Sequence, residues 1–208
     1  MRMLFAALLG GLLITGQVVA QTFEEGTHYR KLANPVSTVD ADRIEVREFF
    51  SYGCPFCNQF LPRINAYEER AADDVVVVKH PVVFNRQTES LGRAFVVAEE
   101  LDVVDEVHGA LFVAYHGDGN RLDSAERVAD VFEAQGIDRQ EVLDAWESFG
   151  VETGLTRYQQ NLRRYMVSST PSMAVNGRYF IDMNMAGNQE RLIRIVEFLV
   201  EKERNGAR

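Results

Sequence analysis

Two stretches of the chain carry apolar residues in the pattern of β-strands. Residues 44–50 (IEVREFF) alternate with a period of two and are rich in aromatic side chains. Residues 75–78 are four consecutive valines, a run typical of a strand buried on both faces, and Lys79 ends that run. Each stretch is therefore predicted to be a strand.

The first strand contains an acidic residue on its apolar face. Counting in steps of two from Ile44 places Glu48 on the same face as Val46 and Phe50. Two interpretations remain open at this point. Glu48 lies either in water at a frayed strand end or in the interior as a buried carboxylate just before the cysteines.

From about residue 88 to residue 165 the apolar positions recur with the period of helices. Asp123 with Glu126, and Asp138 with Glu141, have the spacing of capping boxes and predict two helix N-termini. Residues 117–120 (GDGN) predict a loop, and calcium binding there is not expected because the rest of an EF-hand loop is missing. The segment is predicted to be a helical block.

The strand pattern returns near the C-terminal end. Residues 173–175 and 178–181 flank Asn176-Gly177, which is the strongest short signal for a β-hairpin. A last helix follows, with an apolar stripe at helical spacing formed by Leu192, Ile195, Val196 and Leu199. The predicted order is strand, helix, strand, helical block, hairpin and helix.

Residues 1–20 have the features of a secretory signal peptide. A short positive start at Arg2 precedes an apolar run over residues 4–14, and small residues up to Ala20 suit a signal peptidase. A membrane anchor needs roughly 18 or more apolar residues, and this run is shorter. We expect cleavage near Ala20, with the mature chain beginning near Gln21.

The charge of the chain excludes some partners. The formal net charge is −9 over 208 residues and the pI is about 5.0, so no basic patch is available for nucleic acid or an anionic membrane surface. No nucleic acid partner is expected.

Cys54 and Cys57 are the only cysteines of the chain, and they stand in a C-x-x-C arrangement around Pro55 and Phe56. A disulfide between them closes too short a loop to constrain the unfolded chain, so a chemical role is favoured over a structural one. A helix is predicted to begin at Cys54 or Pro55, because proline suits the first turn. Unpaired N–H groups and the helix dipole there would stabilise a thiolate. Cys54 is thus the expected nucleophile, and Cys57 the more enclosed resolving partner.

A zinc site is the competing interpretation of the two cysteines. Structural zinc needs four ligands, and the four histidines are scattered without ligand spacing, so no metal is expected and the histidines receive no role. No flavin or nicotinamide motif is present either. The expected redox group is the Cys54–Cys57 disulfide itself, without a cofactor.

The segment 48–57 (EFFSYGCPFC) closely resembles the active-site strand and turn of the DsbA family of periplasmic dithiol oxidases, and the resemblance continues through the helical block and residues 171–179 (PSMAVNGRY). It covers essentially the whole mature chain. The resemblance implies an α/β, thioredoxin-like fold with an inserted α-helical domain. The implied organisation is a signal peptide at 1–20, a first thioredoxin-like part at 21–85, a helical insertion at 86–165 and a second thioredoxin-like part at 166–208.

The resemblance also implies roles for individual residues. Thr170-Pro171 corresponds to a cis-proline loop beside the disulfide, at which substrate binds as an extended segment. The family's buried acid corresponds to Glu48 and its basic partner to Lys79, and in the family such a pair tunes proton movement near the buried cysteine. This sequence departs from the best-known members of the family at two positions. Those members have histidine where this chain has Phe56, and valine where it has Thr170. The loss of an imidazolium near Cys54 points to a somewhat weaker oxidant.

Three functional hypotheses follow. The first is a dithiol oxidase that passes its disulfide to newly exported, unfolded polypeptides in the periplasm, acts as a monomer and is reoxidised by a DsbB-type membrane quinone reductase. A specialised DsbL-like oxidase with one client is a variant of it. The second is an isomerase or reductase, for which residues 21–43 are too few to form a dimerisation domain. The third is a non-enzymatic polypeptide-binding module.

Overall fold

The structure is a computed structural model that describes residues 22–206. The predicted signal peptide and its cleavage point near Ala20 therefore lie outside the described residues. Within this part of the chain, five strands form one sheet in the order β1-β5-β4-β2-β3. Their bounds are β1 Arg30–Lys31, β2 Ile44–Phe50, β3 Val75–Pro81, β4 Ser172–Val175 and β5 Tyr179–Asp182.

The sheet is mixed, and the strand with the cysteines at its end lies inside it. β2 runs parallel to β3 and antiparallel to β4. β3 is an edge strand, and Val76, Val77 and Val78 are only partly buried. The prediction of a strand buried on both faces was wrong for 75–78, because a run of valines does not distinguish a central strand from an edge strand under partial cover.

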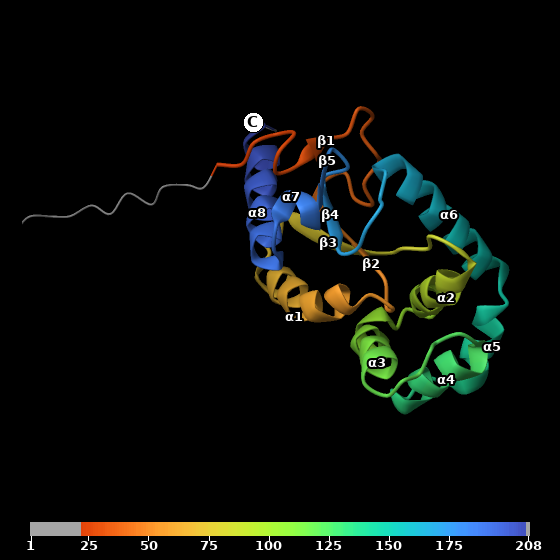
Figure 1. Cartoon of the computed structure of the whole chain (residues 1–208). Helices are drawn as coiled ribbons and strands as arrows, with labels where there is room; N and C mark the ends of the chain where they lie inside the picture. The colour runs from red at the N-terminus through yellow and green to blue at the C-terminus, as the bar shows by residue number, and fades with distance from the viewer. Residues whose placement is uncertain (1–21, 207–208) are drawn as a thin grey trace, which may run out of the picture.

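Two long helices cover one face of the sheet, as Figure 1 shows (α1 and α8). Their side chains and the facing strand residues form one core cluster, which includes Val46, Phe60, Ile64 and Met173. The final apolar stripe of the sequence is buried there as predicted. The bounds are α1 Pro55–Arg70, α8 Gln189–Gly206 and a short preceding helix, α7 Met183–Ala186.

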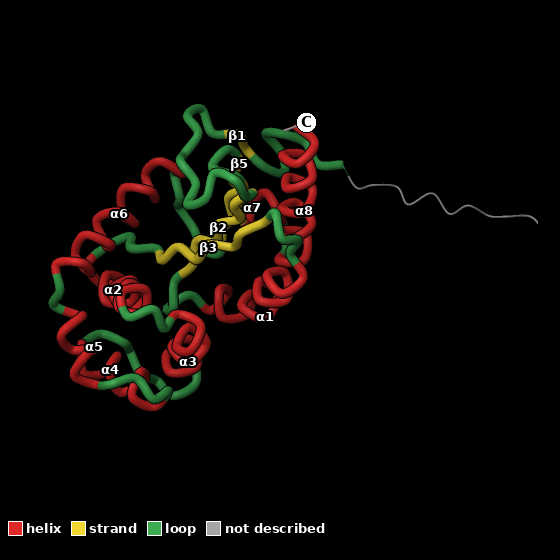
Figure 2. The backbone as a smooth tube through the Cα atoms, turned by 180° about the vertical axis from the view of Figure 1, so that it is seen from behind, coloured by secondary structure: helices red, strands yellow, loops and turns green. Residues whose placement is uncertain are grey.

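Five helices lie between β3 and β4 in the sequence, and most of them gather beyond one end of the sheet in Figures 1 and 2. Phe50 and Tyr52, which lead from β2 to the cysteines, belong to the same core as these helices. The active-site strand therefore joins the sheet to the helical block. The bounds are α2 Arg86–Glu100, α3 Val104–His116, α4 Ala125–Ala134, α5 Arg139–Trp146 and α6 Phe149–Tyr165.

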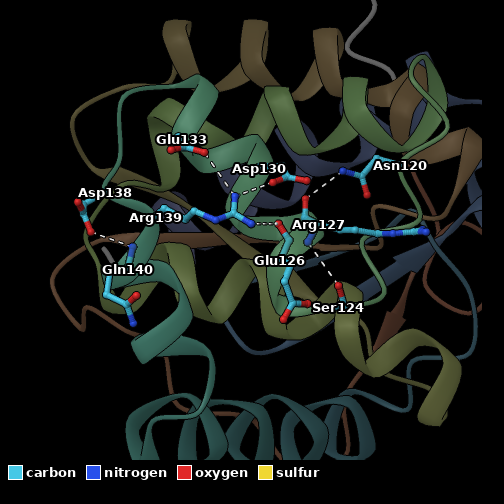
Figure 3. A network of polar contacts seen from close by, with 9 residues as sticks. All are labelled: Asn120, Ser124, Glu126, Arg127, Asp130, Glu133, Asp138, Arg139 and Gln140. Atoms are coloured by element: carbon cyan, nitrogen blue, oxygen red, sulfur yellow. Dashed lines mark hydrogen bonds and ion pairs between the residues drawn. The ribbon is translucent and has the colours of Figure 1, made fainter.

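One predicted helix start is confirmed and the other is shifted. The Asp138 carboxylate accepts from the backbone N–H groups of Gln140 and Glu141 and caps α5 (Figure 3). α4 is capped instead by Ser124, whose hydroxyl accepts from the Arg127 N–H. Asp123 was the wrong choice of cap because adjacent Asp and Ser are equally good caps by type, and only the backbone path selects one.

The hairpin after β4 has the predicted turn. Asn176 and Gly177 both have positive φ angles, of 50° and 62°, and the Arg178 N–H donates to the Val175 carbonyl. A Cβ added to Gly177 would lie 1.8 Å from the Val36 carbonyl oxygen, so only glycine fits there.

None of the helices within residues 22–206 combines the length and apolar character needed to span a membrane.

Candidate active site

Cys54 occupies the N-cap of α1, directly after β2. Its sulfur accepts from the Cys57 N–H at 3.3 Å, and Pro55 fills the first helical position, where no N–H is needed. Its own backbone is held by a bond from the Cys54 N–H to the Ser51 carbonyl. The sequence prediction of a helix beginning at these residues is confirmed, and it puts the sulfur at the positive end of the helix dipole.

The surroundings of Cys54 favour its thiolate. A hydrogen bond from the Cys57 thiol is the largest contribution, and it lowers the pKa of Cys54 to about 6 against the opposing effect of partial burial. A hydrogen bond with the Thr170 side chain, and bonds from the backbone N–H groups of Cys57 and Phe56, lower it further. A half-buried sulfur with such a pKa is largely a thiolate at neutral pH.

Cys57 has the opposite environment. It is 1% exposed and packs in the core shared with the helical block. Burial, the hydrogen bond to Cys54 and the negative charges of Cys54 and Glu48 raise the pKa of Cys57 far above its usual range. The structure holds both residues as free thiols, so it describes the reduced form. One sulfur is accessible and acidic, and the other is enclosed and protonated.

The Thr170-Pro171 loop lies against Cys54. The peptide bond between these two residues is cis, which is the geometry implied by the family resemblance. The Thr170 carbonyl is 3.4 Å from the Cys54 sulfur, which donates to it as a thiol. β4 begins at the next residue, Ser172, so the sheet positions the loop.

Glu48 is buried, which decides between the two interpretations left open by the sequence. It is 2% exposed, and its Oε2 atom has no hydrogen-bond partner among the described residues. Burial raises the pKa of Glu48 to about 8, and the positive charge of Lys79 opposes this rise. Glu48 is therefore largely protonated at neutral pH.

Lys79 lies directly opposite Glu48 on the neighbouring strand β3, in register. Its ammonium group does not bind Glu48, however. The Lys79 Nζ pairs with the Glu68 carboxylate at 2.9 Å, at the surface of α1. Lys79 thus affects the pKa of Glu48 through its electric field and without a hydrogen bond, while its ion pair is with Glu68.

Phe56, between the two cysteines, points to solvent with 61% of its surface exposed. Its carbonyl accepts from the Gln189 side chain at 2.8 Å, which ties the active-site turn to the start of α8. An exposed phenylalanine contributes no charge to Cys54. It leaves an apolar contact surface beside the reactive sulfur.

Two buried polar pairs near the site could not be predicted from the sequence. Glu45 and Arg47 form a bidentate ion pair, at 2.7 and 2.8 Å, on the face of β2 opposite Glu48. His108 of α3 is 5% exposed, and its Nδ1 lies 3.0 Å from the Tyr52 hydroxyl. If the second face of the sheet is assumed to be exposed to solvent, the alternation along β2 predicts that Glu45 and Arg47 are exposed. Only the fold shows that this face is covered and that the two residues are buried.

The fold and this geometry define a class. A C-x-x-C pair at the N-terminus of the first long helix, beside a cis-proline loop of a mixed sheet, is the arrangement of a thioredoxin-like thiol:disulfide oxidoreductase. Residues 45–192 match the family model described as DSBA-like thioredoxin domain. The chain belongs to this DsbA-like family.

Individual relatives agree with this assignment. A thiol:disulfide interchange protein DsbA of Pseudomonas syringae is 33% identical over 189 residues, which cover 91% of this chain and 88% of the relative. The Azotobacter vinelandii protein of the same name is 35% identical over 180 residues, covering 86% and 84%. The crystal structure of Pseudomonas aeruginosa DsbA has a TM-score of 0.84 at 33% identity and covers 89% of this chain and 96% of that one.

Proposed function

We propose that this protein oxidises pairs of thiols in exported, unfolded polypeptides through a disulfide between Cys54 and Cys57. The observation that carries the proposal is the contrast between the two sulfurs. Cys54 is accessible with a pKa lowered to about 6, whereas Cys57 is enclosed behind it. An attacking client can reach only Cys54, and the bond to Cys57 then breaks.

The reaction balances as two exchanges. A client thiolate attacks the Cys54 sulfur, forming a mixed disulfide, and Cys57 leaves as a thiolate that takes up a proton. A second client thiolate then attacks the client sulfur of the mixed disulfide, and Cys54 leaves as a thiolate. The client loses two electrons and gains a disulfide, and the protein is left as the dithiol.

The low pKa of Cys54 favours this direction. A thiolate with a pKa of about 6 stabilises the reduced form at pH 7 by at most about 1.4 kcal/mol over an ordinary thiol, and solvent screening of the half-exposed sulfur reduces that figure. The corresponding change in potential is about 30 mV or less toward an oxidant. Cys54 therefore supplies part of the oxidising power, alongside the leaving-group advantage of an acidic thiol.

Glu48 is proposed to exchange the proton of Cys57. Its negative charge is among the causes that raise the pKa of Cys57, so the two groups are close enough to interact. Its own pKa of about 8 allows it to be protonated or ionised near neutral pH. Lys79 is proposed to keep that pKa from rising further. Both act on the buried sulfur and not on the client.

The cellular setting follows from the oxidase role. The predicted signal peptide would deliver the protein to the periplasm, where newly exported polypeptides are the clients. A DsbB-type membrane quinone reductase would return the protein to its disulfide form, and the protein would act as a monomer without a bound cofactor. We propose that the chain at Thr170-Pro171 receives the client in extended form.

The direct test mixes the oxidised protein with a reduced, unfolded polypeptide that contains two cysteines and follows client disulfide formation by mass spectrometry. We expect stoichiometric oxidation by the native protein and none by the Cys54→Ser variant. The Cys57→Ser variant should accumulate a mixed disulfide when started from an activated Cys54. Undiminished client binding by Cys54→Ser, with no client oxidation by the native protein, would instead identify a binding module.

A further inference from the structure

An open hollow lies beside Cys54, and it has one wall from the sheet end and one from the helical block. Cys54 and Thr170 line one side of it. Leu91 and Tyr115 of the helical block line the other, together with Phe84, which is 49% exposed. The cationic side chain in the lining is Arg121, from the loop between α3 and α4.

Arg121 differs from most arginines of the described chain. It is exposed and has no hydrogen bond or ion pair within residues 22–206. Other exposed arginines, such as Arg43, Arg70 and Arg127, are paired with carboxylates. In a chain with a net charge of −9, a cation left without a carboxylate beside the reactive sulfur is available to an outside anion.

The position of Arg121 is held by its two neighbours. The Asn120 side chain donates to the Arg127 carbonyl and accepts from the Leu122 N–H, both at 2.9 Å, and Figure 3 shows Asn120 turned toward Arg127. Leu122 is fully buried in the core of the helical block. The backbone at Arg121 is therefore held in place on both sides, so the side chain of Arg121 extends from a fixed backbone position.

We propose that Arg121 binds a carboxylate of the client polypeptide next to the client cysteine that attacks Cys54, so that this protein prefers clients with an acidic residue near the reacting thiol. The inference rests on the proposed oxidase function. A carboxylate near a thiol raises the pKa of the thiol and slows its attack, and a guanidinium that pairs with the carboxylate removes this penalty. Phe84 and Leu91 provide the apolar contact for a neighbouring client side chain.

The hollow does not end at Phe84. The same phenylalanine lines a second hollow, which continues to Met166 at the end of α6 and includes Arg163. Met166 is 60% exposed, and Arg163 has no ion pair among the described residues. Glu89, which lies 3.4 Å from Arg93, also lines this second hollow. Two adjoining hollows with exposed apolar side chains suit an extended chain of several residues better than a small anion.

The test compares two unstructured peptides with two cysteines each, which differ only by Glu or Gln two residues from the first cysteine. The rate at which each peptide reduces the oxidised protein is measured and divided by the rate at which the same peptide reduces hydroxyethyl disulfide, an uncharged reference. We expect the native protein to prefer the Glu peptide about two- to fivefold, the range of an exposed ion pair. Added salt should lower the ratio.

The variants assign the preference to one side chain. Arg121→Gln should bring the ratio close to one, and Arg121→Lys should retain part of the preference. Arg127→Gln is the matched control, because it removes the same charge from the adjoining helix without lining the hollow, and it should keep the native ratio.

A ratio near one for the native protein, or a preference that survives in Arg121→Gln, would overturn the assignment while leaving the oxidase function intact. Failure of both peptides to reduce the oxidised protein would overturn the proposed function itself, and the assignment with it.

Discussion

The two cysteines share one helical turn but differ in every property that matters for exchange. Cys54 faces the surface at the helix N-terminus, and Cys57 is covered by the core that β2 shares with the helical block. Because a thiolate is the reactive species, the difference in pKa decides which sulfur a small electrophile modifies first.

In the reduced protein, the rate of alkylation by iodoacetamide should therefore rise with pH as the titration of one thiol, with a midpoint at about pH 6. In an unfolded control chain the midpoint of this rise should be at about pH 8.5. Cys54 has a depressed pKa, so its thiolate contributes to the stability of the reduced form above the unfolded pKa, and this contribution is lost as the pH falls through about 6. Mass spectrometry of the modified chain measures both the midpoint and the site. A midpoint above 8, or modification of Cys57 first, would contradict the assignment of the nucleophile.

Glu48 costs stability when it ionises. Its pKa of about 8 in the folded chain lies above the ordinary value of 4.5, because burial disfavours the carboxylate. Below about pH 4.5 both states carry the proton and there is no cost. Between these two values the cost grows with pH, and above about 8 it is constant.

The Glu48→Gln variant should accordingly be as stable as the native protein at pH 4 and more stable by on the order of 2–4 kcal/mol at pH 8. Urea unfolding at several pH values measures the difference. The control is Glu69→Gln, an exposed carboxylate on α1 whose removal should change the unfolding free energy by less than about 0.5 kcal/mol at every pH. A pH-independent effect at Glu48 would show that its charge is not the cause.

Some residues of the site could be predicted from the sequence and others could not. The period of two on β2 placed Glu48 with apolar neighbours, and the structure confirms its burial. Lys79 was assigned to Glu48 by resemblance, yet its ammonium group reaches Glu68 instead. Long flexible side chains choose partners in three dimensions, and the same holds for Glu45 with Arg47 and for His108 with Tyr52.

At the scale of elements, local signals specify helix starts only to within a residue or so. Ser124 and Asp138 are the N-caps of α4 and α5, and their side-chain oxygens satisfy backbone N–H groups of the first turn. Asp123 precedes the cap of α4 and pairs with Arg127 at the surface. Figure 3 shows both helix starts in one polar network, which Arg139 joins through Asp130 and Glu133.

Substitutions at these positions should separate a cap from its neighbour. Ser124→Ala and Asp138→Ala should each lower the unfolding free energy by about 1 kcal/mol, the usual effect of losing an N-cap. Asp123→Ala should cost no more than about 0.5 kcal/mol, because it removes only an exposed ion pair. Thermal unfolding of the three variants measures the order of these losses in stability. A larger loss of stability for Asp123→Ala than for Ser124→Ala would show that Asp123 is the N-cap of α4.

For the whole molecule, the order of elements was readable but their arrangement was not. The alternating and helical periods predicted the strands, the helical block and the hairpin. The strand order β1-β5-β4-β2-β3, and the edge position of the valine-rich β3, depend on long-range pairing that no local pattern encodes. The fold class came from the resemblance and is confirmed by the family match and the Pseudomonas aeruginosa structure.

The arrangement links the redox site to two parts of the molecule at once. β2 delivers Cys54 between the sheet and the helical block, so the reactive sulfur borders both the Thr170 loop and Arg121. A client that binds along this border, as we propose, would contact both parts. The domain limits themselves, at residues 85 and 165, stay a prediction.

The central claim is that the Cys54–Cys57 couple is an oxidant, and its equilibrium potential against glutathione tests this most directly. The reference values are about −120 mV for DsbA and about −270 mV for thioredoxin, and neither is derived from this structure. We expect a value well above −200 mV, somewhat below the DsbA reference because Phe56 supplies no charge to Cys54. A value near −270 mV would contradict the oxidase account and assign the chain to reduction or isomerisation.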